Sequence, residues 1–441
     1  MTADNFDSRL ANRILWGLLI GAIAGGATLL IGGIYPGVLP AVRGFATALL
    51  DPLGQIFLRM LFFVVIPLVF ASLATGVAQL ERLTQLGPLA IRTFVLFFLN
   101  MSIAVALGLV MMNVVEPGSA MDPEAQATLL EEYGGAAQEH VEKRAAQPAV
   151  TPMTVVEMFM PRNLFGAFVG SNRDLLGDVL PLILFAILVG AAAVRLPRDR
   201  RDRLRSGLSL VNDLMTGIVH FALSIAPYAV PAMIYSVIVK IGWDIVIALG
   251  AFVLGCIAVM LLHLFGTMSV WLKLLARRRP LEFWGLIRPV LVTAFSTSSS
   301  AATLPTALAV ARNQLGIRAP VAGFVLPLGA TMNMAGTALY EGCVVLFVAQ
   351  IFGIELGMAQ QLTLLLLAVL SAVAVAAIPG GSLPLIVGLL AAFGIPPEGI
   401  GIILGVDRLL DMTRTMVNVS SDVVTATVVD RHTTLGEATA A

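Results

Sequence analysis

Five polar residues recur at helical spacing in one stretch near the end of the chain, and the opposite face of that helix is mainly apolar. The stretch GVDRLLDMTRTMVNVSSDVV, residues 405–424, contains Asp407, Asp411, Arg414, Asn418 and Asp422. Gaps of 4, 3, 4 and 4 residues, at about 100° per helical residue, place all five within an arc of roughly 80°. If this helix crosses a membrane, each charge costs about 2.5–3.5 kcal/mol on insertion scales. The stripe must therefore face a polar interior.

A structural ion-pair ladder that only holds helices together is the alternative explanation of this stripe. Carboxylates outnumber the single guanidinium, however, and Asn418 contributes no charge. An unequal set leaves positions for cations and for a charged ligand. Arg408 lies outside the stripe, and we interpret it as a snorkelling or helix-packing residue.

A run of hydroxyl side chains, STSSS at residues 296–300, interrupts another apolar segment. Hydroxyls and free backbone N–H groups at the ends of two opposed half-helices make a cradle for a carboxylate. An ordinary serine-rich turn is common in water but unfavourable between two apolar arms. A serine nucleophile would need a general base. The histidines, none in a recognisable pairing with this run, are His140, His220, His263 and His432.

The segment PLGATMNMAGTALYEG, residues 327–342, combines helix-breaking residues with a carboxyl group. Gly329, Asn333 and Gly336 suit a break in a membrane helix whose carbonyl groups bind a cation. Glu341 follows in an apolar half-helix, where burial without a fixed partner favours the protonated form. Glu341 is therefore a candidate proton carrier. The alternative is a carboxyl that a neighbouring hydroxyl satisfies and that carries no proton.

The composition places these residues in a membrane protein. The chain has 441 residues, is 58% hydrophobic and only 12% charged, and has a mean hydropathy of +0.93. Soluble domains usually carry about 25% charged residues, so a bilayer is the natural solvent. Basic and acidic residues are equal at 27 each, which gives no reason to expect a nucleic-acid partner. Cys256 and Cys343 lie in apolar stretches and predict neither a disulfide framework nor a metal site.

The apolar segments predict an all-α integral membrane protein with eight transmembrane helices and two re-entrant helical hairpins. The candidate spans are Ile14–Val38, Leu49–Val77, Leu86–Val115, Val155–Val194, Leu208–Val239, Ile245–Leu275, Val321–Phe352 and Ile395–Val429. The two hairpins, Leu281–Leu315 and Leu362–Phe393, are broken by STSSSAATLP and IPGGSLP. Such breaks cannot face lipid, and paired interrupted segments indicate inverted repeats with a binding site between them.

Loop charges predict the orientation of the chain in the membrane. Basic residues cluster at Arg9 and Arg13, at residues 195–205 and at residues 273–279, whereas residues 116–148 are acidic. Placing the basic loops inside and the acidic connection outside alternates correctly through the first six spans. We therefore expect a multi-pass protein of the inner (plasma) membrane with both termini in the cytoplasm.

Four motifs together resemble the excitatory amino-acid transporter and dicarboxylate/amino acid:cation symporter family. They are AFSTSSSAATLP at 294–305, NMAGT at 333–337, IPGGS at 378–382 and DRLLDMTRTMVNVSSD at 407–422. The resemblance covers essentially the whole chain and implies a homotrimer of independently moving protomers. It implies a scaffold from residues 1–85 and 118–240. Residues 86–117 and 241–441 would form a mobile transport domain that carries its cargo as an elevator.

The resemblance also implies roles for individual residues in substrate binding. Arg414 matches the arginine that pairs with the side-chain carboxylate of the substrate, and Asp411 matches the carboxylate that holds the α-amino group. Having both argues for glutamate or aspartate, since a plain dicarboxylate has no amino group and a neutral amino acid needs no arginine. The other matching substrate contacts are Thr337, Asn418, Ser298, Ser299, Ser300, Ile378 and Ser382.

Sodium coupling is where the chain departs from the family pattern. Asp422 and Asn418, with carbonyl groups near Gly329 and Asn333, match one sodium site. A further site in the family uses an aspartate and three side chains of the third span. Those positions hold Ala335, Phe97, Asn100 and Met101 here. A hard cation prefers oxygen ligands, so we hypothesise that this site is absent and that sodium stoichiometry is reduced. Glu341 matches the glutamate of proton-coupled members.

The expected function is secondary symport of glutamate or aspartate into the cell, coupled to protons, to a reduced number of sodium ions, or to both. No covalent cofactor and no enzymatic activity are expected. One alternative is a carrier of the same fold for dicarboxylates or neutral amino acids. Another is a channel or a membrane enzyme. Uptake against a gradient into sealed vesicles separates a carrier from the second alternative.

Overall fold

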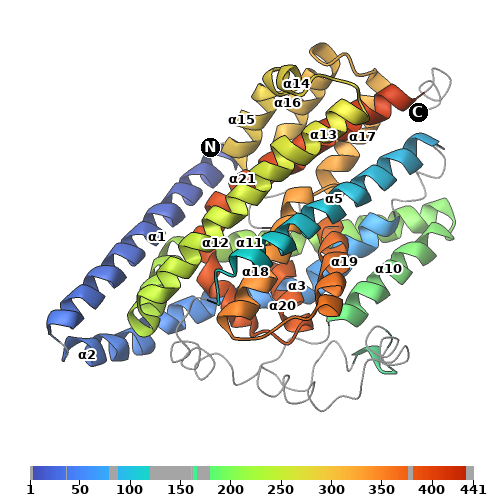
Figure 1. Cartoon of the computed structure of the whole chain (residues 1–441). Coiled ribbons are helices and arrows are strands. Elements are labelled where there is room, and N and C mark those ends of the chain that lie inside the picture. Colours follow the sequence, from blue (N-terminus) through green and yellow to red (C-terminus); the bar gives the residue numbers. More distant parts are fainter. Residues whose placement is uncertain are drawn as a thin grey trace.

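The computed structural model is helical throughout the part of the chain that it describes (Figure 1). It describes residues 3–35, 37–78, 88–119, 160, 162–165, 179–375 and 381–433. The α-helices are α1 (Ala3–Ile34), α2 (Val38–Phe45), α3 (Asp51–Ala78), α5 (Pro88–Val115), α10 (Val179–Val194), α11 (Arg198–Ile241), α12 (Trp243–Leu261), α13 (Met268–Leu274), α14 (Pro280–Leu286), α15 (Arg288–Thr297), α16 (Ser300–Asn313), α17 (Ala319–Met332), α18 (Ala335–Ile351), α19 (Met358–Ala374), α20 (Leu383–Ala392) and α21 (Ile400–His432). Two π-helices, η1 (Ala46–Leu50) and η2 (Leu262–Thr267), and a 3₁₀-helix, η3 (Pro397–Gly399), join some of them.

Large apolar side chains cover much of the outer surface, as expected for a protein that is solvated by lipid. Trp16 is 66% exposed, Phe63 77%, Leu254 71% and Leu281 89%. A soluble monomer rarely leaves so much apolar surface in water. Within the described ranges, three helical stretches are long and apolar enough to cross a membrane: Pro88–Val115, Trp243–Leu274 and Ala319–Ile351. The sequence predicts eight membrane spans, which is more than these three stretches.

The basic cluster at residues 195–205 is mainly helical, so its prediction as a loop is wrong. Helix α10 ends at Val194 and α11 begins at Arg198. Arginine is a good helix former, and Arg203 pairs with Asp199 one turn earlier at 2.8 Å. The predicted acidic connection lies outside the described residues after position 119, as do most residues of the fourth predicted span before position 179.

Helix breaks occur at all three places where the sequence predicts them. In the first hairpin, α15 ends at Thr297 and α16 begins at Ser300, and Ser298 between them has the left-handed backbone angle φ 50°. In the seventh predicted span, α17 ends at Met332 and α18 begins at Ala335. The second hairpin consists of α19 and α20, and residues 376–380 at its tip lie outside the described part.

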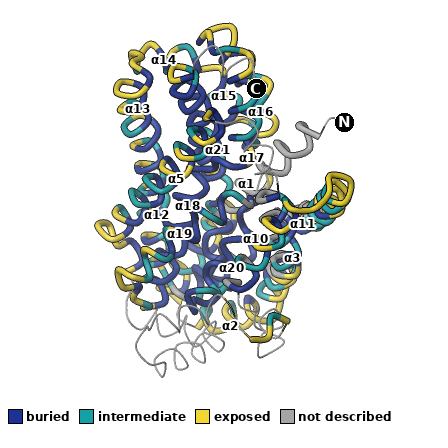
Figure 2. The backbone as a smooth tube through the Cα atoms, turned by 90° about the vertical axis from the view of Figure 1, so that its right-hand side faces the viewer, coloured by how far each residue is buried: buried dark blue, intermediate teal, exposed yellow. Residues whose placement is uncertain are grey.

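Small residues allow α1 to approach α11 closely. Gly17, Gly21 and Gly25 repeat every fourth residue along α1. A Cβ atom at Gly21 would lie 2.6 Å from the main-chain oxygen of Pro231 on α11. This stripe resembles the small-residue pattern that packs membrane helices against each other. Helices α18 and α21 lie at the centre of the molecule, and Figure 2 shows α18 almost entirely buried.

Candidate functional site

A small polar cavity lies where the first hairpin, the α17–α18 break, the start of α20 and the middle of α21 meet. Its lining residues are Ser298, Ser300, Met334, Thr337, Val375, Ser382, Asp411, Arg414, Thr415 and Asn418. Seven of the nine predicted substrate contacts are among them. The cavity measures about 10 Å³, roughly the room for one water molecule. An amino acid can therefore enter only if the surrounding elements move apart.

Arg414 is the electrostatic centre of this cavity. Its Nε donates to Asp411 Oδ1 at 2.7 Å, and its Nη1 donates to Ser382 Oγ at 2.6 Å. Asp407 Oδ1 lies 3.5 Å from the same Nη1, and the guanidinium carbon stands 4.9 Å from the ring centre of Tyr340. A guanidinium that is only 2% exposed needs such partners to compensate for its lost hydration.

Asp407, assigned from the sequence only to the polar stripe, and Tyr340, not singled out there, are both site residues. The Tyr340 hydroxyl donates to Asp407 Oδ1 at 2.9 Å, so the carboxylate that faces Arg414 is itself held from α18. Asp407 lies seven residues before Arg414, two helical turns away on the same face of α21. That spacing is the signal that could have indicated the pairing.

Asn418 joins α21 to the start of α18. Its Oδ1 accepts from the backbone N–H groups of Gly336 at 2.7 Å and Thr337 at 3.2 Å, and its Nδ2 donates to Thr337 Oγ1 at 3.1 Å. A Cβ atom at Gly336 would lie 2.4 Å from the main-chain oxygen of Arg414. Glycine at this position thus lets the half-helix approach α21 closely enough for these bonds.

The tip of the first hairpin supplies a free hydroxyl. Ser298 is buried, and its Oγ has no hydrogen-bond partner among the described residues. Ser299 does not line the cavity; its side chain caps α16 by accepting from the Ala302 N–H at 3.2 Å. Ser300 begins α16 and lines the cavity. Ile378, the remaining predicted contact, lies outside the described residues.

Asp422 contacts Asn333 at the place where a sodium ion is predicted. Asp422 lies on α21, one helical turn after the cavity residue Asn418. Asn333 Nδ2 donates to Asp422 Oδ1 and to Ser421 Oγ, each at 2.9 Å. A Cβ atom at Gly329 would lie 2.3 Å from Asp422 Oδ1, so the glycine provides the space for this buried carboxylate. Among the described residues, no group of three His, Cys, Asp or Glu side chains could hold a metal ion. A cation here would depend on one carboxylate and on carbonyl oxygens, which is a donor set that suits sodium.

The four positions of the cation site predicted to be absent are all buried. Phe97 is 1% exposed, Met101 2%, and Asn100 and Ala335 0%. Asn100 Nδ2 donates to Asn333 Oδ1 at 3.2 Å. Of these four side chains, only that of Asn100 carries an oxygen.

Glu341 lies on α18, and its carboxyl group is enclosed by the surrounding helices. It is 0% exposed, and neither carboxyl oxygen has a hydrogen-bond partner within the described part of the chain. The Ser371 hydroxyl on α19 lies beside this carboxyl and interacts with it. Both the proton-carrier role and the alternative, a carboxyl that a neighbouring hydroxyl satisfies, therefore agree with the surroundings of Glu341.

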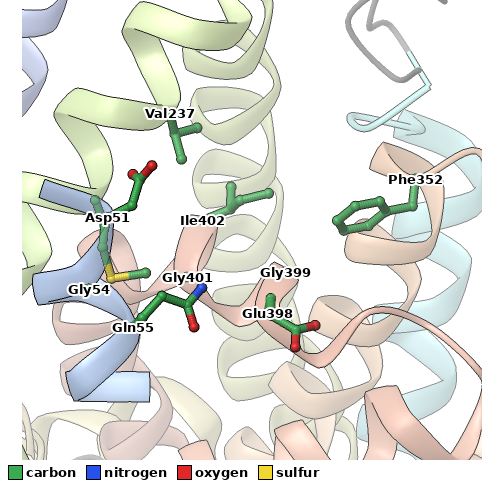
Figure 3. A pocket seen from close by; sticks show the side chains of 10 residues that line it. Asp51, Gly54, Gln55, Val237, Phe352, Glu398, Gly399, Gly401 and Ile402 are labelled. Atoms are coloured by element: carbon green, nitrogen blue, oxygen red, sulfur yellow. The ribbon is translucent and has the colours of Figure 1, made fainter. Parts of the chain in front are cut away.

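A second cavity, of about 30 Å³, lies between α3 and α11 on one side and the ends of α18 and α21 on the other (Figure 3). Asp51, Gln55 and Glu398 contribute its polar groups. Asp51 already pairs with Lys240 at 2.6 Å and accepts from Ser236. This cavity contains none of the predicted site residues. It lies at the boundary between the predicted scaffold and the predicted transport domain.

Comparison with known proteins identifies relatives along almost the whole chain. The family model described as the sodium:dicarboxylate symporter family matches residues 10–432. A proton/sodium-glutamate symport protein of Bacillus subtilis (strain 168) is 32% identical over 96% of this chain and 92% of the relative. A C4-dicarboxylate transport protein of Deinococcus radiodurans is 30% identical over 91% of this chain and 86% of the relative. Human excitatory amino acid transporter 3 is 29% identical over 84% of this chain and 76% of the relative.

These matches confirm the resemblance that the four motifs indicated. They also agree with the helical architecture and the apolar surface, and they place the chain among transporters rather than enzymes. Relatives named for glutamate and for C4-dicarboxylates both occur at about the same identity. The chain belongs to the sodium:dicarboxylate symporter family and is a cation-coupled, multi-pass membrane symporter.

Proposed function

We propose that this symporter imports an acidic amino acid, glutamate or aspartate, rather than a plain dicarboxylate. The observation that carries the proposal is the Arg414–Asp411 pair at the wall of the polar cavity, at 2.7 Å. The guanidinium can take the side-chain carboxylate of the substrate in a bidentate contact. Asp411 then remains as the acceptor for an ammonium group, which a dicarboxylate does not have.

The remaining cavity residues suit the α-carboxylate of such a substrate. Ser298 offers a hydroxyl that has no hydrogen bond within the described residues. Ser300 stands at the beginning of α16, and a helix N-terminus favours an anion. Thr337 and Asn418 bond each other and line the same wall. On entry, the substrate would take the place of the Ser382 hydroxyl on Arg414.

Coupling would use one sodium ion near Asp422 and a proton on Glu341. A bound sodium ion would supply the positive charge that an ionised Asp422 needs within a bilayer. Asn333 and Gly329 define its surroundings. The carboxyl oxygens of Glu341 are buried and have no hydrogen bond that meets the distance and angle limits within the described structure. This environment favours a carboxyl group that crosses the membrane in its neutral form. The replacement of side-chain ligands at Phe97, Met101 and Ala335 supports a reduced sodium stoichiometry.

Movement would follow the division predicted from the sequence, with residues 86–117 and 241–441 as the transport domain. In support, α5 packs against α18 and α19, whereas α11 packs against α1 and α3. The start of α1 and the end of α21 lie toward the same end of the molecule (Figure 1), which supports two cytoplasmic termini. We propose the homotrimer on the family resemblance alone.

Competition for uptake tests the substrate assignment. Proteoliposomes with the purified protein take up radiolabelled aspartate in the presence of unlabelled glutamate, succinate or alanine. Glutamate should compete strongly and succinate and alanine weakly, because only the acidic amino acids satisfy both Arg414 and Asp411. Stronger competition by succinate than by glutamate would instead favour the dicarboxylate alternative, for which the Deinococcus radiodurans relative is the precedent.

A further inference from the structure

We propose that His263 and Asn100 are positioning residues of the cation site around Asp422. The inference deepens the proposed sodium coupling and rests on it. A continuous chain of hydrogen-bonded side chains connects His263 on η2, Asn100 on α5, Asn333 at the α17–α18 break and Asp422 on α21. We call these four residues the polar relay. Sequence analysis treated the histidine only as a possible base for Ser296–Ser300.

The distances make the relay continuous from one end to the other. His263 Nε2 lies 3.1 Å from Asn100 Oδ1, and Asn100 Nδ2 lies 3.2 Å from Asn333 Oδ1. Asn333 Nδ2 lies 2.9 Å from Asp422 Oδ1. His263, Asn100 and Asn333 are all 0% exposed. Three polar side chains buried to this extent are costly unless each is hydrogen-bonded.

The chemistry of the acceptor fixes the direction of the relay. An ionised carboxylate only accepts hydrogen bonds, so Asn333 must turn its amide nitrogen toward Asp422. Its oxygen then faces Asn100, which must turn its own nitrogen toward Asn333 and its oxygen toward His263. His263 must therefore carry a proton on Nε2. Every donor in the relay points toward Asp422.

Asn333 is the residue through which the relay would act on a cation. Its backbone leaves the helical conformation, with φ −116° and ψ 67°, just where α17 ends. The side chain is held from α5 on one side and from α21 on the other. This double anchorage fixes the main-chain carbonyl groups at the break and the position of the Asp422 carboxylate. Asn100 stands at one of the four positions where the family pattern has cation ligands. Its side chain donates an N–H group to Asn333 instead of contacting a cation.

The π-helical segment places His263 in the relay. Helix α12 continues into η2 at Leu262, and an inserted residue of this kind shifts the direction of the following side chains. His263 Nδ1 is buried and has no hydrogen-bond partner among the described residues. Within the described residues, the contact with Asn100 is therefore the polar anchor of the ring.

Sodium-dependent thermal stabilisation of the purified, substrate-free protein tests the role without any transport step. Sodium is titrated against choline, and the sodium concentration at half-maximal stabilisation is compared among variants. The variants are His263→Leu, Asn100→Leu, His263→Gln, Met260→Leu and Asp422→Asn. His263→Leu loses one relay hydrogen bond and should raise the sodium midpoint about tenfold. Asn100→Leu loses two relay hydrogen bonds and should raise the midpoint at least as much. His263→Gln, which keeps an N–H donor, should stay near the wild-type midpoint. Met260→Leu, a buried apolar control on α12, should not change it.

A positioning role also predicts that the affinity for aspartate does not change. At saturating sodium, the relay variants should bind aspartate as the wild type does, because the relay does not line the substrate cavity. Folded His263→Leu and Asn100→Leu proteins with wild-type sodium midpoints would overturn the proposal. If the leucine variants do not fold, Asn100→Ser carries the same test, since a short hydroxyl cannot bridge His263 and Asn333. A wild type without sodium stabilisation, or an Asp422→Asn variant with a normal midpoint, would refute the proposed sodium site itself, and the relay role with it.

Discussion

Arg414 shows at the residue scale how a charge is kept within a bilayer and still remains available to a ligand. Asp411 holds its Nε side, and Asp407 and Ser382 share its Nη1. Arg408 adds a guanidinium 3.7 Å from Asp411, so it is a partner of the stripe rather than a snorkelling side chain. The Ser382 hydroxyl is the weakest acceptor of this set, because it carries no charge. A substrate carboxylate can replace it with a gain in electrostatic energy.

Replacing Arg414 with alanine should abolish the binding of acidic amino acids. The change removes a charge-assisted contact and leaves Asp407 and Asp411 facing each other, so we expect a loss of binding free energy of about 2–5 kcal/mol. Binding and uptake of radiolabelled aspartate measure the effect. Arg13→Ala is the control, because Arg13 is exposed and contacts Tyr228 far from the cavity. Aspartate affinity equal to that of the wild type would show that the guanidinium does not hold the substrate.

Replacing Glu341 with glutamine should remove the dependence of uptake on external pH. Glutamine keeps the size and polarity of a protonated glutamate but cannot release a proton. Uptake by the wild type should rise as external pH falls, since protonation neutralises a carboxyl that is buried. Initial uptake rates at acid and neutral external pH measure the ratio for both proteins. If the variant still responds to acid, another group carries the proton.

At the scale of elements, the α17–α18 break is the feature on which the site depends. The break brings Asn333 to Asp422 and brings the first N–H groups of α18 to Asn418. Two glycines allow this approach, Gly329 next to Asp422 and Gly336 next to the Arg414 backbone. The neighbour of Gly336 is rigid main chain, so this position tolerates no added volume, whereas the neighbour of Gly329 is the Asp422 side chain.

Gly336→Ala should therefore impair folding and substrate binding together. Its Cβ would lie 2.4 Å from a main-chain oxygen, and overpacking of this kind costs about 1–3 kcal/mol or more. Gly323→Ala on α17 is the matched control, because nothing lies within 4 Å of its added Cβ. Thermal unfolding of both variants in detergent, followed by aspartate binding, measures the difference. A Gly336→Ala protein as stable as Gly323→Ala would contradict the close approach.

The helix breaks and the polar stripe of α21 were predictable because each rests on local sequence. Hydroxyls between apolar arms, glycine beside asparagine, and charges at helical spacing each have a physical cause within a few residues. The contacts of Tyr340 with Asp407 and of His263 with Asn100 were not predictable in this way. They join residues 67 and 163 positions apart, and nothing in the local pattern indicates the partner.

The start of α11 shows a different limit of sequence reasoning. The arginine-rich cluster at residues 195–205 was interpreted as a loop on the inner side of the membrane, because basic residues are enriched in cytoplasmic loops. A long helix can project beyond the bilayer, however, and α11 has 44 residues. That length exceeds the approximately 20 residues that a hydrocarbon core requires. Charge thus indicated where the membrane ends, but it did not indicate where the helix ends.

At the scale of the whole molecule, polar and apolar surfaces are reversed relative to a soluble protein. Apolar side chains such as Phe63 and Leu254 are exposed, whereas the charged side chains of Asp407, Asp411, Arg414 and Asp422 on α21 are buried. Figure 2 shows buried backbone at the centre of the molecule and exposed backbone at its margins. A cavity of about 370 Å³ with an apolar lining lies between α1, α11, α12 and α21. It follows the boundary between the proposed scaffold and the proposed transport domain. Loose apolar packing at such a boundary is compatible with sliding of one part along the other.

Uptake of radiolabelled aspartate and glutamate into proteoliposomes, with sodium and proton gradients imposed separately, tests the substrate and the coupling together. We expect accumulation against a concentration gradient, with an imposed proton gradient sufficient to drive uptake and sodium increasing it. The Arg414→Ala protein should show no accumulation under any gradient. Uptake that strictly requires sodium and ignores the proton gradient would contradict the coupling proposed for Glu341. Absence of accumulation of either amino acid would contradict the assignment of the substrate.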